Sequence, residues 1–314
     1  GKSEDKVFQE AWRTVRRRKK AQFAEWLQQM HGLSVDPQTR FDVQIKRIHE
    51  YKRQLLNLLH VLHDYLRLKD NPNLDLTPRT VILAGKAAPG YHMAKEIIRL
   101  AIAISQLLEQ DARVHEKLRL VFVPNYGVAA AQKLIPAADL SQHISTAGTE
   151  ASGTSNMKFV LNGAPILGTL DGANIEILAA VGAENGFIFG LTTPEVQEVR
   201  EGGYNPEETL HRNPELKAAL KLLVKGKLAS GKGEGFRDLH DSLVFSDHYL
   251  LLADFASYAE CHERVESAWR DPERWTRMSI QNTAGAGSFS SDRTIRQYAE
   301  EIWNLRAVPV KSPV

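Results

Sequence analysis

The sequence predicts an α/β fold, in which a doubly wound parallel sheet with helices on both faces is followed by a mostly helical region. Two observations carry this prediction. Short apolar runs rich in β-branched residues end at glycine or proline, which is typical of buried strands. Between these runs, apolar residues recur at steps of three and four, which is typical of amphipathic helices. Strands that alternate with helices favour a parallel sheet, and such sheets bind ligands at the carboxyl ends of their strands.

The elements are expected in a simple order along the chain. A helix over residues 10–29 comes first, without a strand before it. Strands are expected over residues 41–45, 81–84, 120–123, 166–170 and 186–190. Further helices are expected after Lys46, where apolar residues recur from Ile48 to Tyr65, and over residues 91–109. The core of the sheet then spans about residues 41–195, and residues 196–314 are mostly helical, with a glycine-rich loop over residues 230–235.

Bulk composition is that of an ordinary globular protein. The 314 residues are 43% hydrophobic and 25% charged, and the formal net charge of +2 is too small to indicate a nucleic-acid or membrane partner. The single cysteine, Cys261, cannot form an internal disulfide. No apolar run approaches the roughly 20 residues that span a bilayer, and the polar first residues do not form a signal peptide. We therefore expect a cytoplasmic location.

A cluster of cations follows the first expected strand. Lys46, Arg47, Lys52 and Arg53 fall within eight residues. The start of a helix offers free N–H groups and the positive end of the dipole, while arginine and lysine add donors that match phosphate oxygens. The cluster therefore indicates an anion site, and the alternative is a solvated helix face.

Three other features are expected to be structural. One is a second basic run, on the helix over residues 10–29, which lacks the position at a strand end and is expected to be a solvated face: Arg13, Arg16, Arg17, Arg18, Lys19 and Lys20. Residues 85–91, GKAAPGY, match neither common glycine-rich nucleotide-binding pattern and are expected to form a tight turn. His49, His92 and His143 lack metal-ligand spacing, so no metal site is expected.

Residues 146–159, TAGTEASGTSNMKF, combine small and hydroxylated residues with a lysine. Such a backbone can approach a ligand closely and present N–H groups to an anion. Its hydroxyl and amide groups suit the phosphate of a phosphorylated aldehyde cofactor, and the amine of Lys158 suits a Schiff base with the aldehyde. Glu150 is placed to accept hydrogen bonds from sugar hydroxyls. The alternative is a loop of Ser, Gly and Thr with an incidental lysine.

Together these segments resemble the glycogen, starch and maltodextrin phosphorylase family. The resemblance runs from about residue 41 to residue 303, in residues 46–54, 85–95, 135–141, 144–154, 156–158, 168–174 and 289–295. It implies two Rossmann-like domains of the GT-B glycosyltransferase type, with this chain as the truncated C-terminal catalytic domain. The implied reaction transfers the terminal α-1,4-linked glucose of glycogen, starch or maltodextrin to orthophosphate and releases α-glucose 1-phosphate with retained configuration.

The resemblance also implies a cofactor and the roles of individual residues. Pyridoxal 5′-phosphate would form a Schiff base with Lys158, and its phosphate would act through the substrate phosphate in proton transfer. The other residues implied around the cofactor are Lys46, Tyr126, Gly153 and Thr154. Those implied in catalysis are Arg47 and Lys52, which would hold the substrate phosphate, and Glu150. Those implied in substrate binding are Tyr51, Ser152 and Gly153.

The chain departs from the family pattern in three places. Tyr126 is followed by GVAAAQ, where the family more often has a serine and a glutamate, and Gln142-His143 replaces the usual Glu-Gln pair. The family's N-terminal domain, which supplies a glycine loop over the phosphates and most of the homodimer interface, is not in this sequence. The opening strand of the C-terminal domain is also expected to be missing. We therefore expect the isolated chain to be inactive.

Two other functions stay open. A nucleotide-sugar glycosyltransferase can share the two-domain design, but it would have no use for the segment that ends in Lys158. A non-catalytic remnant could bind phosphate or glucan, although five intact residues speak against long decay: Lys46, Arg47, Lys52, Glu150 and Lys158. The sequence does not indicate which glucan is preferred.

Overall fold

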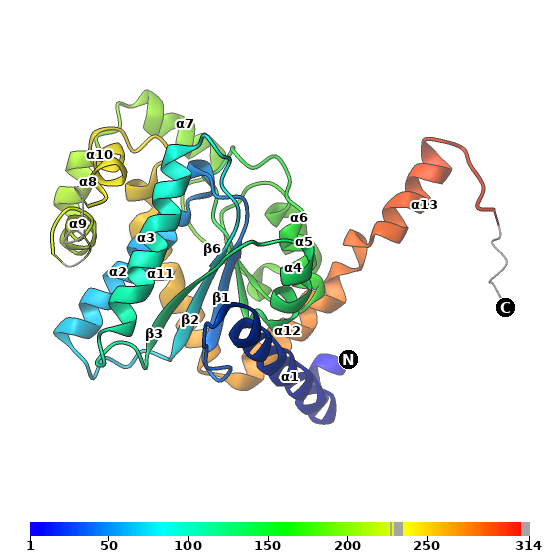
Figure 1. Ribbon diagram of the computed structural model, residues 1–314. Coiled ribbons are helices and arrows are strands. Elements are labelled where there is room, and N and C mark those ends of the chain that lie inside the picture. The colour runs from blue at the N-terminus through cyan, green and yellow to red at the C-terminus, as the bar shows by residue number, and fades with distance from the viewer. Residues whose placement is uncertain (227, 229–234, 309–314) are drawn as a thin grey trace.

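The computed structural model describes residues 1–226, 228 and 235–308 of the chain, so the glycine-rich loop expected over residues 230–235 lies outside the described residues except for Gly235. A six-stranded parallel sheet in the order β3-β2-β1-β4-β5-β6 forms its centre (Figure 1). The strands are β1 (Arg40–Ile45), β2 (Arg79–Ala84), β3 (Leu118–Val123), β4 (Leu140–His143), β5 (Ile166–Gly168) and β6 (Phe187–Ile188). The predicted parallel α/β sheet is confirmed. The strand order reverses between β1 and β4, which is where such sheets usually bind ligands.

Strand β4 was not among the predicted strands. Its sequence, LSQH, has no apolar alternation, yet all four residues are buried. Two of its polar side chains find partners inside the protein, because Ser141 Oγ donates to the carbonyl of Pro165 and the hydroxyl of Tyr258 donates to Gln142 Oε1. Pairing with β1 and β5 therefore makes a central strand of a segment whose local pattern does not indicate one.

The first helix, α1 (Lys6–His31), is longer than predicted at both ends. The Asp5 side chain caps it by accepting hydrogen bonds from the amides of Val7 and Phe8, and Gly32 ends it in the left-handed conformation with φ of 67°. The expectation of a fully solvated basic face is wrong, because Lys20 is buried and the Arg16 side chain is mostly buried beside Asp139. The other four cations of the run are more accessible to solvent: Arg17 and Arg18 are exposed, and Arg13 and Lys19 are half-buried.

The helix expected directly after Lys46 begins later than predicted. Residues 46–53 form a loop and the short 3₁₀ helix η2 (Glu50–Lys52), and α2 spans Gln54–Asp70. Arg53, in the left-handed conformation with φ of 57°, separates the two. Its buried guanidinium donates to the carbonyl of Ile144 at 2.6 Å and to Asp254 at 2.7 Å. These contacts fold the loop toward the end of β4 and start the helix at Gln54.

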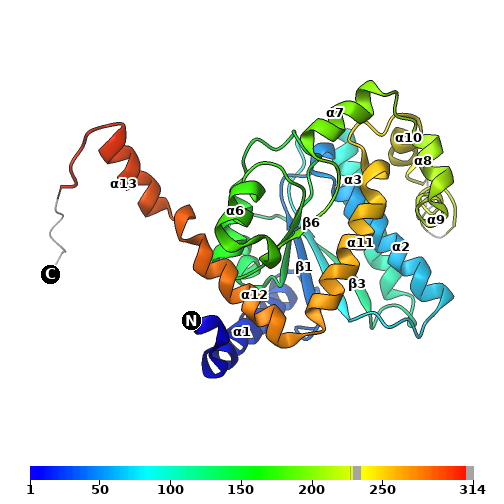
Figure 2. The ribbon, with the colours of Figure 1, turned by 180° about the vertical axis from the view of Figure 1, so that it is seen from behind.

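Helices cover both faces of the sheet, as predicted (Figures 1 and 2). Side chains alternate between two cores along β2, since Val81 and Leu83 join one while Ile82 and Ala84 join the other. The first core includes α2, α3 (His92–Glu109) and α11 (Leu251–Trp269). The second core includes α1, α4 (Val128–Leu134) and α5 (Ser155–Leu161), and α12 (Pro272–Gly285) packs on α1 and α5.

The region after residue 196 is mostly helical, as predicted. Helix α6 (Asn174–Val181) precedes this region and α7 (Thr193–Glu201) opens it. The other described α-helices of the region, besides α11 and α12, are α8 (Pro206–Arg212), α9 (Pro214–Lys221), α10 (Arg237–Phe245) and α13 (Ser291–Glu301). Helix α13 has no buried residue and projects away from the rest of the chain (Figures 1 and 2). Among the described residues, no helix combines the length and the apolar character needed to cross a membrane.

Candidate functional site

The carboxyl ends of β1 and β4 bring three of the predicted residues together. Lys46 directly follows β1, Lys52 lies on η2, and Glu150 lies in the loop after β4. The Glu150 Oε2 atom is 2.7 Å from Lys52 Nζ and 3.7 Å from Lys46 Nζ. Ser145 Oγ donates to the same oxygen at 2.9 Å. The expected anion site therefore has a physical basis, in which two ammonium groups share one carboxylate.

Burial changes the acid–base behaviour of these groups. The Lys46 side chain is only 8% exposed, and this burial lowers its pKa to about 8 despite the attraction of Glu150. Burial by itself would raise the pKa of Glu150, but the hydrogen bond from Lys52 and the charge of Lys46 lower it below its ordinary value. At neutral pH the two ammonium groups exceed the Glu150 carboxylate by one positive charge, and the nearby carboxylate of Asp171, which lines the same cavity, offsets this excess.

Asp171 holds the loop that carries Glu150. Its Oδ2 atom accepts hydrogen bonds from the backbone amides of Thr149 at 3.2 Å and Glu150 at 2.8 Å. The next residue, Gly172, has a φ of 51°, and a Cβ there would lie 2.4 Å from the carbonyl oxygen of Ser152. The two loops approach too closely for any side chain at this position. Asp171 was not among the predicted site residues, although its place shortly after a strand end was a usable signal.

His143, the last residue of β4, was also not among the predicted site residues. The side chain is 3% exposed, and neither ring nitrogen has a hydrogen-bond partner among the described residues. It lines a very small cavity of about 10 Å³, which is room for about one water, together with Lys46, Ser145, Glu150, Ser152, Asn156, Thr169, Asp171 and Asn174. Burial, followed by the charges of Lys46 and Lys52, holds the pKa of His143 well below its ordinary value. A buried imidazole without a partner is suited to a polar atom of a ligand or a water.

Among the described residues, the other predicted residues make no hydrogen bond or ion pair with the Glu150 carboxylate. The ring of Tyr51 lies 4.4 Å from Lys52 Nζ, and Gly153 adopts a φ of 108° in the loop before α5. No interaction among the described residues connects Lys158, Tyr126 or Arg47 with the pair formed by Lys52 and Glu150. The predicted residues that are exposed are Arg47, Ser152, Thr154 and Lys158. Tyr126 is half-buried against the core beneath α1, where burial raises the pKa of its hydroxyl.

Comparison with known proteins identifies the family. The sequence profile of the carbohydrate phosphorylases matches residues 2–305. This chain belongs to the carbohydrate phosphorylase family. It is similar to the glycogen phosphorylase of Synechocystis sp., with 52% identity over 97% of this chain. It is also similar to the human muscle form, with 48% identity over 96% of this chain, and to the bovine brain form, with 47% identity over 95%. The chain spans about 36% of the length of each of these relatives.

The phosphorylase chain also contains a buried histidine cluster away from this site. Ligand atoms of His60, His63 and Asp64 lie within 4.8 Å of one another, as in some metal sites, although no metal site was expected from the sequence. Arg79 donates hydrogen bonds to Asp64 and to Nδ1 of His60. The positive charge of the Arg79 guanidinium lies beside the Asp64 carboxylate, and it therefore opposes the binding of a cation there.

Proposed function

We propose that this chain carries the cofactor-bearing half of an α-glucan phosphorylase site. In this proposal it is the C-terminal catalytic domain of a two-domain GT-B enzyme, with its sheet core over about residues 41–195 and its mostly helical part over residues 196–314. The substrates are a glucan such as glycogen, starch or maltodextrin and orthophosphate, and the product is α-glucose 1-phosphate. The observation that supports the proposal best is the joint contact of Lys46 and Lys52 with Glu150 at the switch point of the sheet.

The residues present fit pyridoxal 5′-phosphate. Lys158 offers an exposed primary amine, as a Schiff base requires. Gly153 has a positive φ, and a Cβ there would lie 3.2 Å from Asn156 Oδ1, so this position in the loop before α5 favours glycine. Lys46, Gly153 and Thr154 would hold the phosphate of the cofactor, and Tyr126 would lie beside its ring. When bound, this group would supply a second phosphate for general acid–base chemistry.

The remaining residues would bind and orient the substrates. Arg47 and Lys52 would hold orthophosphate, since Arg47 offers an exposed forked donor and Lys52 is positioned by Glu150 and by the ring of Tyr51. Glu150, whose backbone Asp171 fixes, would accept hydrogen bonds from glucose hydroxyls together with Ser152 and Gly153. Clustered cations would offset the repulsion between two phosphates that must approach each other.

The site is open in the part of the chain that the structure describes. Arg47, Ser152 and Lys158 are all exposed, whereas catalysis by such contacts depends on the exclusion of water. We therefore propose that a further domain closes the site, that the closed enzyme is a cytoplasmic homodimer, and that this chain by itself does not release glucose 1-phosphate.

Borohydride reduction of the chain after incubation with pyridoxal 5′-phosphate tests the cofactor proposal. Reduction should fix one cofactor on the peptide that contains Lys158, and Lys158→Arg should abolish this labelling. The variant Lys95→Arg, at an exposed lysine of α3, is the control and should label like the parent chain. Label on another lysine with Lys158 free, or no label on a folded chain, would contradict the proposal, and the second result would favour a nucleotide-sugar glycosyltransferase.

A further inference from the structure

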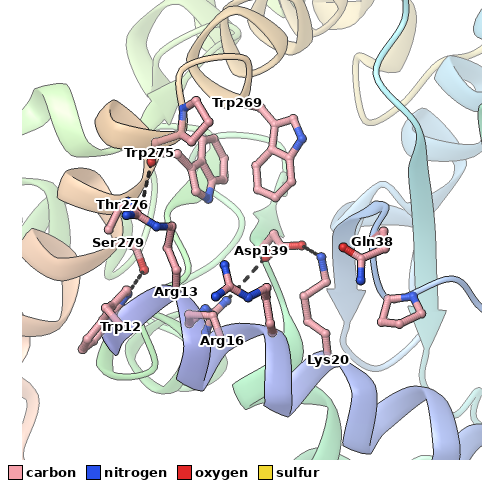
Figure 3. A pocket seen from close by; sticks show the side chains of 13 residues that line it. Trp12, Arg13, Arg16, Lys20, Gln38, Asp139, Trp269, Trp275, Thr276 and Ser279 are labelled. Atoms are coloured by element: carbon pink, nitrogen blue, oxygen red, sulfur yellow. Dashed lines mark hydrogen bonds and ion pairs between the residues drawn. The ribbon is translucent and has the colours of Figure 1, made fainter. Parts of the chain in front are cut away.

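A second cavity lies at the opposite edge of the sheet, beside the amino ends of β1 and β4 (Figure 3). Gln38 shortly precedes β1 and Asp139 directly precedes β4, so this cavity is separate from the cluster around Glu150. Its volume is about 270 Å³, which is close to the lower end of the range of small-molecule sites. Its lining residues come from α1, from the turns before the two strands, and from the junction of α11 and α12.

The wall of this cavity carries an excess of positive charge. Four cations line it against a single carboxylate, that of Asp139: Arg13, Arg16, Arg17 and Lys20. Asp139 is already in use, because Lys20 Nζ lies 2.5 Å from Oδ2 and the amide of Phe41 donates to the same oxygen. Glu10, outside the cavity, pairs with Arg13 and Arg17. Each of the two carboxylates, Asp139 and Glu10, is thus shared by two cations, so the four cations and two carboxylates leave a net excess of two positive charges around the cavity.

Arg13 is the cation best placed to meet a ligand. Arg16 is held by the carbonyls of Pro136 and Asn162 at 3.0 and 2.6 Å, and Lys20 by Asp139 and the carbonyl of Thr39. Arg13 instead reaches across the cavity to Thr276 through a long contact of 3.4 Å, as Figure 3 shows. Its other partner, Glu10, has a side chain that is 55% exposed. The guanidinium can therefore turn to an anion at little cost, since an exposed ion pair contributes little to stability.

Indole rings form the apolar part of the wall. Trp269 and Trp275 meet edge to face with centroids 5.0 Å apart, and Trp12 lies on the side formed by α1 (Figure 3). A hydrogen bond of 2.9 Å from Trp12 Nε1 to Ser279 Oγ fixes the ring of Trp12. Such faces bind flat aromatic rings by stacking and edge contacts. A neutral sugar could also lie on them, but it would leave the excess positive charge without a partner.

We propose that this cavity binds a planar aromatic anion, with its ring against the indoles of Trp269 and Trp275 and its acidic group at Arg13. The proposal is independent of the function proposed for the Lys52–Glu150 site, since none of the lining residues belongs to that site. The anionic group can be a carboxylate or a phosphate ester, because a guanidinium binds both in the same forked manner.

Isothermal titration calorimetry of the 314-residue chain tests this proposal with three probes. These are 2-naphthoate, 2-naphthyl phosphate and the uncharged 2-naphthalenemethanol. At least one anion should bind, and the uncharged probe should bind at least about 10-fold more weakly. The anion that binds more tightly identifies the acidic group of the natural ligand.

Two variants on the same helix separate binding from folding. Arg13→Gln should weaken the anion by about 10-fold or more, while Arg18→Gln, at an exposed position of α1, should leave its affinity unchanged. Circular dichroism melts should be alike for both variants. The proposal is overturned if neither anion binds at millimolar concentration, if the uncharged probe binds as tightly, or if the two variants weaken binding equally.

Discussion

The ammonium of Lys52 lies 2.7 Å from a carboxylate oxygen of Glu150, although the two residues stand 98 positions apart in the sequence. This contact joins the segment that follows β1 to the loop that follows β4. Lys46 approaches the same oxygen from the end of β1. One carboxylate therefore positions two cations at the edge of the sheet where a ligand is expected, and each of its partners can be tested.

Anion affinity at this edge is expected to fall as the pH rises through about 8. Lys46 is the group responsible, because burial lowers its pKa to about 8 and it attracts an anion only below that value. Titration calorimetry with sulfate, which stays a dianion throughout, should show roughly 10-fold weaker binding at pH 9 than at pH 7. Lys46→Arg should remove most of this difference, since arginine stays charged. An equal loss of affinity in Lys46→Arg would assign the titration to another group.

In a longer protein that contains this chain and is active, Arg47→Ala should impair the use of orthophosphate. Removal of a forked, charge-assisted contact should lower kcat/KM for orthophosphate by roughly 10- to 150-fold. The cofactor content, measured by absorbance, should not change. Arg18→Ala on the outer face of α1 is the matched control. Unchanged phosphate kinetics together with loss of the cofactor would place Arg47 beside the cofactor instead.

A dianion bound near Lys46 should bring the titration of His143 into an observable range. In the free chain, burial and two nearby ammonium groups hold the pKa of His143 well below its ordinary value. A negative charge beside the cavity that His143 lines would offset the charges of the two ammonium groups and raise the pKa of His143.

Nuclear magnetic resonance of the histidine C2 protons measures this response between pH 5 and 8. One resonance should be flat without sulfate and should titrate with it, and His143→Gln should remove that resonance. Lys46→Ala should abolish the response to sulfate. If sulfate binds by calorimetry while the resonance of His143 stays flat, the imidazole does not face the anion.

The buried histidine cluster should make the protein sensitive to acid. Burial lowers the pKa of His60 to about 3, from an ordinary value of 6.5 in the unfolded chain. The unfolded chain therefore binds this proton at higher pH, so the stability that neutral His60 contributes is present above about pH 6.5 and is lost as the pH falls toward 3. The free energy of unfolding should decrease by about 1.4 kcal/mol for each pH unit below 6.5 through this residue.

Urea denaturation at pH 7.0 and 4.5 tests this expectation. His63 acts in the opposite direction, because hydrogen bonds with Asp64 and Glu215 outweigh its burial and raise its pKa. The informative comparison is therefore between variants. His60→Gln should reduce the acid-induced loss of stability, whereas His211→Gln, at an exposed position of α8, should not. Equal losses in the two variants would show that His60 is not the group that titrates.

Much of the fold and part of the site could be predicted from local patterns. The apolar runs of β1, β2 and β3 mark buried strands, and these predict the parallel sheet and its ligand-binding edge. Lys46 was therefore recognised as a residue at a strand end, and residues 146–159 as a loop suited to an anion. Such patterns predict strands and helices correctly because the residues of an element that is buried on one face or on both are themselves apolar at regular positions.

Tertiary structure alone decided the features that depend on distant partners. In the polar strand β4, hydrogen bonds with Pro165 and Tyr258, both distant in the sequence, offset the burial of Ser141 and of the Gln142 side-chain oxygen. The burial of Lys20 follows in the same way from Asp139, 119 positions later in the sequence. The lack of a hydrogen-bond partner for the His143 ring likewise depends on residues distant in the sequence, because it can be recognised only once all neighbouring side chains are placed. The sequence by itself thus determined the parallel sheet and the kinds of side chain, ammonium and carboxylate among them, that lie at its ligand-binding edge. Only the folded chain decided which charges pair, because an ion pair depends on the distance in space between groups that the sequence order leaves far apart.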